Sequence, residues 1–515
     1  MPWRFQEIKL INVHIAFRVD ASYQIGTGHL MRCLALADAI HKQGANICFV
    51  SRHMPDYLQS MIEERGYIFK RLTSSSTKSD VQLLDHSHWL GTSQCADAVE
   101  TLNVLSSRLW DWLIVDHYAL DNQWESLLRS SAKKIMVIDD LGDRVHDCDM
   151  LLDQNFYLDM HGRYNDKVPP GCKLLLGPTF ALLRPDFKIL RDRSKVCKDK
   201  VKRVLIFFGG VDPLNYTSHA IKVLASLRYL GLHVDVVIGM QHPKRDEIES
   251  QCATLGFSCH IQTNKIAELM SSADIAIGAG GISTWERCCL GLPSLVFSTA
   301  INQQQQLSDA ACEGLLYAPD MVELDEISLA THIQALIENT PLRTMISANG
   351  MRFVDGFGVM RVVGNLEMCG IEMRLATKED ACTVFNWRNH ESIRNVSRSN
   401  QLIEWTEHQV WFNEILTCSE SNLLIGMVKG SKIGVVRYDY VGNEAEISIY
   451  LAPEKVVSGY GAGLLKSAEQ WLRLNKQDIQ SISAYVLGHN TRSAKFFTSA
   501  GYSVKSTNFI KRLDT

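Results

Sequence analysis

The chain has 515 residues, 46% hydrophobic and 21% charged, a balance typical of a globular protein with roughly three domains of about 150 residues each. Its formal net charge of -4 argues against nucleic acid or a membrane surface as a partner. Fourteen cysteines without Cys-x-x-Cys spacing predict neither a zinc site nor a disulfide framework, and no run approaches 18 apolar residues, so we expect a cytoplasmic protein without metal.

The first predicted domain, 1–200, alternates short apolar strands with amphipathic helices. The strands are expected at 15–19, 47–51, 113–116 and 135–139. Strands separated by helices indicate βαβ units and a doubly wound parallel sheet, and therefore an α/β fold. We expect an exposed loop at 74–79 and a charged, solvated linker at 188–202.

A glycine turn follows the first strand. Gly26 and Gly28 allow a tight turn and expose amides at a helix start, where partial positive charge favours an anion. His29 at this position is a candidate general base, because histidine titrates near neutrality, and Arg32 could supply a fixed positive charge. The alternative is that His29 only caps the helix. Position 31 is Met rather than a third glycine, which argues against a dinucleotide site.

Acidic residues end two later strands, in Asp116-His117-Tyr118 and in Asp139-Asp140. Polar residues at the carboxyl ends of parallel strands line the usual binding crevice. Tyr118 could therefore hold a substrate hydroxyl or phosphate. The alternative is a half-buried tyrosine whose hydroxyl is satisfied locally.

The second predicted domain, 201–368, repeats this rhythm, with strands expected at 204–208, 234–238, 275–277 and 294–297. Gly209 and Gly210 follow its first strand and could turn their amides toward a phosphate. Two doubly wound domains facing a cleft are the expected result.

The stretch 278–286 carries the strongest nucleotide signal in this domain. Gly280 and Gly281 lead into a helix whose first hydroxyls, Ser283 and Thr284, can donate to a diphosphate. Glu286 could accept both hydroxyls of a ribose, or could be a first-turn acid that complements the helix dipole. Asn302 and the four glutamines after it offer amides to the same crevice, unless they form a solvated loop.

The third predicted domain, 371–515, begins with a strand and helices and continues as a meander at 423–428, 432–438 and 445–451. Three glycines then alternate at the start of a helix, which would let amides approach a pyrophosphate: Gly459, Gly461 and Gly463, interleaved with Tyr460 and Ala462. Asn490 and Ser493 open a later helix after a strand at 482–486. They could serve the same ligand or be helix-start residues only.

With these motifs in view, residues 14 to about 365 resemble the UDP-sugar hydrolase family of the pseudaminic acid pathway, which removes UDP from UDP-2,4-diacetamido-2,4,6-trideoxy-β-L-altrose. The resemblance rests on segments in the same order: 18–20, 26–32, 116–118, 139–141, 152–155, 176–178, 208–213 and 278–286. It implies a two-lobed GT-B fold, His29 as the base and Glu286 as a nucleotide contact.

Residues 371–515 resemble the GNAT superfamily, particularly the acetyltransferase that acts on the 4-amino UDP-sugar of the same pathway. The matching segments are 373–375, 379–380, 387–389, 411–412 and 459–463. Two positions depart from the family pattern. Ser458 stands where the acetyl-CoA loop usually has Gln or Arg, and Phe497 stands where the family often has a tyrosine that acts as the general acid. Glu446 could act as the base through a water molecule, and Tyr485 or Tyr502 could replace the acid.

The combined expectation is a bifunctional enzyme that uses acetyl-CoA and a UDP-sugar, with His29, Tyr118 and Glu446 as catalytic residues. Expected substrate contacts are Asp20, Gly28, Arg32, Asn155, Gly209, Gly210, Gly280, Gly281, Ser283, Thr284, Glu286 and Asn302. Expected acetyl-CoA contacts are Leu451, Gly459, Tyr460, Gly461, Ala462, Gly463, Asn490 and Ser493. The alternative is a GT-B glycosyltransferase whose GNAT-like domain only binds acetyl-CoA or a partner.

Overall fold

A computed structural model of the protein describes residues 13–73, 84–192, 200–227, 231–299, 303–319, 325–366, 371–428, 430–455 and 460–505. The expected loop at 74–79 lies outside these residues. The chain divides into two units, Met1–Val359 and Met360–Thr515, and helix α13 (Gly358–Asn365) spans the boundary. The domain limits expected at 200 and 368 remain predictions.

The first unit begins with a seven-stranded parallel sheet in the order β3-β2-β1-β4-β5-β6-β7. Its strands are β1 (His14–Val19), β2 (Asn46–Ser51), β3 (Ile68–Arg71), β4 (Trp110–Asp116), β5 (Ala132–Ile138), β6 (Met150–Asp153) and β7 (Lys173–Leu176). The four expected strands are confirmed. The short strands β3, β6 and β7 were not predicted.

Helices cover this sheet between its strands: α1 (Gly28–His41), α2 (Asp56–Glu63), α3 (Gln94–Leu105) and α4 (Asn122–Leu128). Trp124 and Leu128 of α4 are fully buried against the strands, next to Ala98 and Leu105 of α3. The central strand β1 is buried along nearly its whole length, and the one charged residue within it, Arg18, is paired with Asp20 and Asp97.

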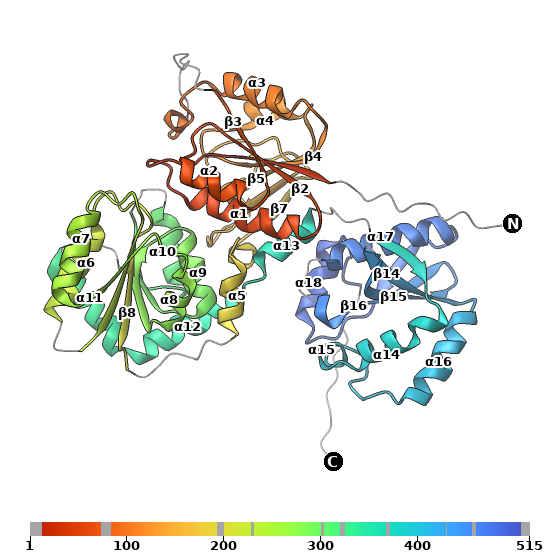
Figure 1. The fold of residues 1–515 in the computed structure, drawn as a ribbon. Helices are drawn as coiled ribbons and strands as arrows, with labels where there is room; N and C mark the ends of the chain where they lie inside the picture. The colour runs from red at the N-terminus through yellow and green to blue at the C-terminus, as the bar shows by residue number, and fades with distance from the viewer. Residues whose placement is uncertain are drawn as a thin grey trace. The chain divides into compact units, whose positions relative to one another are not determined.

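The second sheet of this unit is also parallel, in the order β10-β9-β8-β11-β12. Its strands are β8 (Arg203–Phe207), β9 (His233–Ile238), β10 (Ser258–Ile261), β11 (Ile275–Ala279) and β12 (Ser294–Phe297). Helices α6 (Tyr216–Ser226), α7 (Arg245–Leu255) and α11 (Glu326–Glu338) cover one face. The other carries α8 (Ile266–Ser272), α9 (Ile282–Leu290), α10 (Gln304–Cys312) and α12 (Thr340–Phe353) (Figure 1). Two Rossmann-like sheets are thus confirmed.

The start of the expected charged linker is helical instead. Helix α5 (Pro185–Arg191) buries Phe187 completely and packs on α9. Arg191 donates hydrogen bonds to the backbone oxygens of Cys289, Met351 and Val354. Lys188 and Arg191 therefore belong to an amphipathic helix that contacts α9 and the end of α12. Residues 193–199 lie outside the described part of the chain.

The second unit contains a five-stranded sheet in the order β13-β14-β15-β16-β17, antiparallel except for the last pair. Its strands are β13 (Glu372–Leu375), β14 (Ser421–Val428), β15 (Ser431–Val441), β16 (Glu444–Leu451) and β17 (Ser481–Ala484). Its helices are α14 (Ala381–Asn389), α15 (Glu391–Arg394), α16 (Trp405–Thr417), α17 (Tyr460–Asn475) and α18 (Thr491–Ser499). The expected meander is confirmed.

The two faces of this sheet have separate cores. Leu423, Ile425 and Val435 pack toward α14 and α16, whereas Leu424 and Val436 pack toward α17. This alternation follows from the period of two along a strand, so each strand residue of this sheet faces either the side of α14 and α16 or the side of α17.

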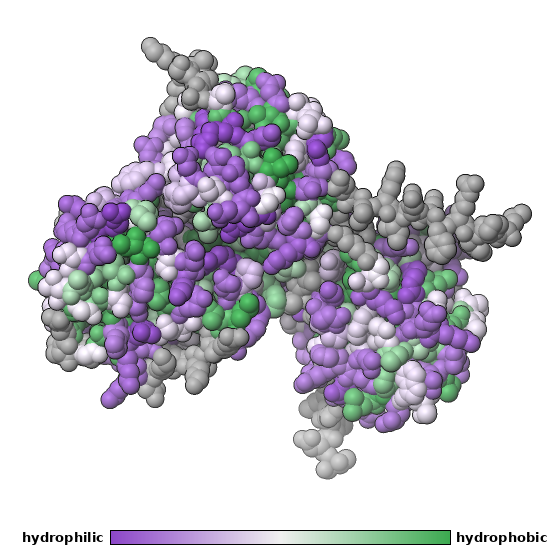
Figure 2. Space-filling view, in the orientation of Figure 1, coloured by the Kyte–Doolittle hydropathy of each residue, from purple (hydrophilic) through white to green (hydrophobic). Residues whose placement is uncertain are grey.

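The visible face of the molecule is mainly hydrophilic, with small hydrophobic areas (Figure 2). In the part of the chain that the structure describes, no helix has both the length and the apolar character needed to cross a bilayer.

Candidate functional site

The imidazole of His29 lies at the start of α1, where the chain has left the carboxyl end of β1. Its Nδ1 is 2.5 Å from a carboxylate oxygen of Asp116, the last residue of β4. The two residues meet because β1 and β4 are neighbouring parallel strands, with Val19 opposite Asp116. His29 does not cap the helix: Thr27 occupies the N-cap, and the ring binds Asp116 instead.

This contact fixes which nitrogen of His29 is basic. A carboxylate only accepts hydrogen bonds, so Nδ1 carries the proton and Nε2 is the unprotonated nitrogen. Among the described residues Nε2 has no hydrogen-bond partner, and 10% of the side chain is exposed. The arrangement is that of a general base held by a carboxylate.

Arg32 lies beside His29 and binds two carboxylates. Its guanidinium donates to both oxygens of Asp116 at 2.7 Å and to Asp140 at 2.7 and 3.0 Å. Burial alone would raise the pKa of Asp116, but Arg32 and His29 hold this pKa well below its usual range, so Asp116 is charged at neutral pH. The guanidinium is therefore committed to protein carboxylates, which differs from the substrate contact expected for Arg32.

Tyr118 packs its ring edge-on against His29, with the ring centroids 4.6 Å apart and the planes at 81°. Its hydroxyl donates to Asp140 at 2.7 Å, and the residue is 7% exposed. Burial raises the pKa of Tyr118 well above its ordinary value, so the hydroxyl stays protonated. These contacts are those of a packed tyrosine satisfied locally, the second of the two roles considered for it.

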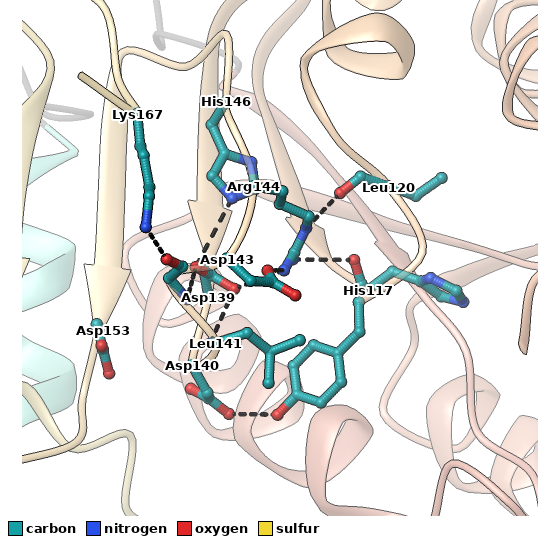
Figure 3. Close-up of polar contacts among 12 residues, drawn as sticks. His117, Leu120, Asp139, Asp140, Leu141, Asp143, Arg144, His146, Asp153 and Lys167 are labelled. Carbon is teal, nitrogen blue, oxygen red and sulfur yellow. Dashed lines mark hydrogen bonds and ion pairs between the residues drawn. The ribbon is translucent and has the colours of Figure 1, made fainter. Parts of the chain in front are cut away.

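The loop that carries Asp140 is fixed by its buried neighbour Asp139 (Figure 3). Asp139 accepts two backbone amides of the loop at 2.9 and 3.2 Å and pairs with Arg144 at 3.0 Å. His146 lies between Asp139 at 3.7 Å and Glu125 at 2.7 Å. Burial lowers the pKa of His146, but these two carboxylates more than offset it and raise the pKa to about 9.

Asp20 is completely buried, which corrects its expected role as a substrate contact. Its carboxylate accepts from Arg18 at 2.7 and 3.2 Å, from the Ser51 hydroxyl at 2.8 Å and from the Arg52 amide at 2.8 Å. With its oxygens occupied and no exposed surface, Asp20 fixes the ends of β1 and β2 instead.

The glycine loop after β8 lies next to the start of α1. A Cβ built on Gly210 would be 3.8 Å from Oγ1 of Thr27, whereas Gly28 and Gly209 have no neighbouring atom within 4 Å of that position. Open space therefore adjoins both loops. Gly209 has a φ of +95°, a conformation that favours glycine.

Helix α9 begins after Gly281, whose φ is +89°, and buries Ser283 and Thr284 in its first turn. Beneath them Arg287 donates to the two hydroxyls at 3.4 and 3.2 Å and to the oxygen of Ala279 at 2.8 Å. Burial lowers the pKa of Arg287 to about 10, so it remains charged at neutral pH. A hydroxyl that accepts from a guanidinium keeps its own proton free to donate to an anion.

Glu286 lies in the second turn of α9, because the helix begins at Ile282. The interpretation as a first-turn acid is therefore wrong. Burial raises the pKa of Glu286 to about 7, although Arg184 and Arg287 act in the opposite direction. Asn302 lies outside the described residues.

Gly280 and Asn155 both lie against residues at the start of α10. A Cβ on Gly280 would lie 3.1 Å from Oε1 of Gln303. Oδ1 of Asn155 accepts from the Trp285 indole and from the Gln306 amide, each at 3.0 Å. Asn155 is 6% exposed, so its carbonyl ties the loop after β6 to α9 and α10 rather than facing a ligand.

Sequence reasoning did not select Asp116 and Asp140 as site residues, although it noted acids after two strands. The missing information was strand order: only the pairing of β1 with β4 brings Asp116 to His29, and only the pairing of β4 with β5 brings Asp140 to Tyr118.

In the second unit, β17 pairs with only the first half of β16. The two strands pair from Glu444 opposite Ser481 to Ile447 opposite Ala484, where β17 ends, while β16 continues to Leu451. A Cβ on Gly461 would lie 3.5 Å from the Phe496 ring and 3.9 Å from the Leu451 side chain, so the first turn of α17 adjoins the unpaired end of β16. That turn holds four expected acetyl-CoA contacts, Tyr460, Gly461, Ala462 and Gly463, whereas Gly459 and Ser458 lie outside the described residues.

Asn490 caps α18, with its Oδ1 accepting the Ser493 amide at 3.0 Å. The contact between these two residues is that of a helix start, which is the alternative considered for them.

Glu446 lies on β16 opposite Ser483 and forms an ion pair with Arg398. The Arg398 guanidinium also lies over the ring of Tyr485, 4.5 Å from its centroid, and Tyr485 is 56% exposed. The Tyr502 hydroxyl instead donates to Glu469 at 2.8 Å. Of the two tyrosines considered as the acid, Tyr485 is therefore the accessible one.

A cavity of about 320 Å³ lies between the sheet and helices α14 and α16. Ser448 and Tyr450 line it from β16, and the period of two places Glu446 on the same face of this strand. Arg388 and Arg437 also line it, and each has a buried nitrogen that finds no hydrogen-bond partner among the residues the structure describes.

Comparison with known families defines the class of each part. Residues 371–503 match the family described as Acetyltransferase (GNAT) domain. The second unit is thus a GNAT acetyltransferase domain, for which acetyl-CoA is the co-substrate. The first unit contains two Rossmann-like parallel sheets. Within the described residues no group of three or more His, Cys, Asp or Glu could hold a metal ion.

Three relatives cover different shares of the chain. It is 23% identical to the uncharacterized protein MJ1062 of Methanocaldococcus jannaschii, over 95% of this chain and 96% of that protein. It is 24% identical to the spore coat polysaccharide biosynthesis protein SpsG of Bacillus subtilis, over 69% of this chain and 98% of that protein. It is 29% identical to the UDP-2,4-diacetamido-2,4,6-trideoxy-beta-L-altropyranose hydrolase of Campylobacter jejuni, over 33% of this chain and 51% of that protein. The expected resemblance to a hydrolase joined to a GNAT domain is confirmed.

Proposed function

We propose that the protein is a bifunctional nucleotide-sugar enzyme of pseudaminic acid biosynthesis in the cytoplasm. The GNAT domain acetylates the amine of a UDP-4-amino-4,6-dideoxy sugar. The first unit then hydrolyses the product, UDP-2,4-diacetamido-2,4,6-trideoxy-β-L-altropyranose, to UDP and free sugar. Similarity to the Campylobacter jejuni hydrolase and the GNAT match support this pair of consecutive reactions.

The observation that carries the hydrolase proposal is the His29–Asp116 contact, which leaves Nε2 of His29 as a base near the edge of the sheet. In the proposed step Nε2 takes a proton from water, and the water oxygen attacks the anomeric carbon. The bond from that carbon to the phosphate oxygen breaks, and UDP leaves with the electron pair. Asp116 stabilises the imidazolium that forms.

The loop between β11 and α9 is the proposed holder of the departing diphosphate. Gly280 and Gly281 present backbone amides, and Ser283 and Thr284 direct their hydroxyl protons away from Arg287. The charge of Arg287 beneath them adds to the positive potential of the helix start. Glu286 is the proposed acceptor for the ribose hydroxyls.

Hydrolysis in water labelled with oxygen-18 tests this mechanism. We expect free sugar and UDP without any added acceptor, with the label in the sugar. Label in UDP would mean attack on phosphorus and would overturn the proposed step, and a strict need for an acceptor would indicate a glycosyltransferase. His29→Ala should lower kcat by about 100-fold to 10,000-fold while UDP binding persists.

For acetyl transfer, the proposed base is Glu446, acting through water on the ammonium of the sugar. Tyr485 follows the last paired residue of β17 and is the proposed donor of a proton to the leaving thiolate. The cavity between the sheet and helices α14 and α16 is the proposed place of the sugar amine, because it shares the face of Glu446. CoA release with the 4-amino UDP-sugar tests this half, and no release by the wild-type protein would leave the domain a binding module.

A further inference from the structure

Next to His29 a cluster of aromatic rings extends beyond the groups that the hydrolysis uses. Tyr118 contacts His29 edge-on. Trp89 stacks on Tyr118, with the two ring centroids 5.5 Å apart and the ring planes at 23°. His86 meets Trp89 at 4.6 Å and Tyr118 at 5.3 Å, both edge-on. We call His86, Trp89 and Tyr118 the aromatic wall.

The loop that supplies Trp89 and His86 is held to the core at its carboxyl end and is closed by a local hydrogen bond. Leu90, the next residue, is 1% exposed, and its oxygen lies 3.3 Å from Nε2 of His53. The Ser87 hydroxyl donates to the oxygen of Leu84 at 2.6 Å. The position of Trp89 is therefore fixed by the fold, and a fixed ring presents a surface at low entropic cost.

Trp89 keeps unused capacity for a ligand. The residue is only partly buried, and its indole N–H has no hydrogen-bond partner within the described ranges of the chain. Burial lowers the pKa of His86, which leaves that ring neutral at neutral pH. The wall offers aromatic faces, a neutral imidazole and one free donor. Its own side chains carry no charge, and the Arg144 guanidinium lies 6.0 Å from the Tyr118 ring centroid.

We propose that Trp89 and His86, supported from behind by the buried Tyr118, receive the diacetamido-trideoxy sugar of the nucleotide sugar and hold its anomeric carbon near His29. This inference rests on the proposed function. Such a sugar has a methyl group at C6 and two acetyl methyls, so much of its surface is apolar and suits aromatic faces. The acetamide carbonyls accept hydrogen bonds, which matches the free indole N–H of Trp89. UDP itself lies beyond this subsite.

Calorimetric binding of UDP-sugar and of UDP separates the sugar contribution from the nucleotide contribution. The measurement uses the His29→Ala background, in which substrate persists. There Trp89→Ala should weaken UDP-sugar binding by about 10-fold and UDP binding by less than about 2-fold. Trp89→Phe, which keeps an aromatic face, should recover most of the loss. Trp405→Ala, a partly exposed tryptophan of the other unit, is the matched control and should change neither affinity.

Equal weakening of both ligands by Trp89→Ala, or no weakening of either, would overturn the subsite. So would a UDP-sugar that binds no more tightly than UDP before Trp89 is changed. If the wild-type protein fails to hydrolyse the sugar, the same titrations in the wild-type background still decide the subsite. If Trp89→Ala does not selectively weaken UDP-sugar binding, the sugar subsite is refuted. If that selective weakening is present but the wild-type protein shows no turnover, only the proposed reaction is refuted.

Discussion

Replacing Asp116 by asparagine isolates the carboxylate that holds the proposed base. The change removes a carboxylate that accepts one hydrogen bond from His29 at 2.5 Å and two from Arg32, each at 2.7 Å. A hydrogen bond to a charged group contributes about 1.5 to 3 kcal/mol, and it strengthens as the imidazolium forms. At 1.36 kcal/mol for each factor of ten, kcat should fall roughly 10-fold to 100-fold. Breaking the buried pair should also lower the free energy of unfolding by about 3 kcal/mol.

The assay compares kcat per folded molecule with urea unfolding of the same preparation. Asp97→Asn is the matched control, because Asp97 is equally buried and accepts from Arg18 at 2.8 Å and from the Trp124 indole at 3.0 Å without touching His29. It should lose similar stability but keep kcat. The reasoning fails if Asp116→Asn retains wild-type kcat, or if Asp97→Asn loses as much activity as Asp116→Asn.

Three further outcomes are expected. Glu286→Gln should weaken UDP binding by roughly 10-fold or more and abolish the preference for UDP over 2′-deoxy-UDP. In the wild-type protein UDP affinity should fall as pH drops through about 7, where Glu286 takes up a proton. His146, whose pKa rises to about 9 on folding, should contribute stability that is complete below about pH 6.5 and lost as pH rises through about 9. The unfolding free energies of wild type and His146→Gln should therefore converge over that range, and a constant difference would contradict the ion pairing. Glu446→Gln and Tyr485→Phe should each slow CoA release by about 100-fold or more. Tyr502→Phe should have little effect, because the Tyr502 hydroxyl binds Glu469; a large loss with Tyr502→Phe and none with Tyr485→Phe would assign the acid to Tyr502.

Expectations drawn from the sequence succeeded where the signal is local. The strands around 15–19, 47–51 and 294–297 were found because apolar runs between helices are visible in the residues themselves. Helix α1 and the glycine turn before it were found for the same reason. Strands β3 and β6 were missed, although β12, which has the same length of four residues, was found.

The site residues divide along a similar line. His29 could be selected from its place after a strand and a glycine turn, because both are features of consecutive residues. Asp20 and Arg32 could not be excluded as ligand contacts, since Ser51, which binds Asp20, and Asp116 and Asp140, which bind Arg32, are brought to them by the sheet and its loops. Burial, which decides whether a charge faces solvent or a counter-ion, is a property of the packed molecule.

The residues in order determined the α/β class, the repeated βαβ pattern, the meander and the glycine turns at helix starts, because each depends on spacing within a few residues. Only the tertiary structure decided that Asp116 orients His29 and that Trp89 stacks on Tyr118. Those contacts join residues from different strands, helices and loops, and strand order, which no local pattern encodes, is what brings Asp116 to the edge where His29 lies.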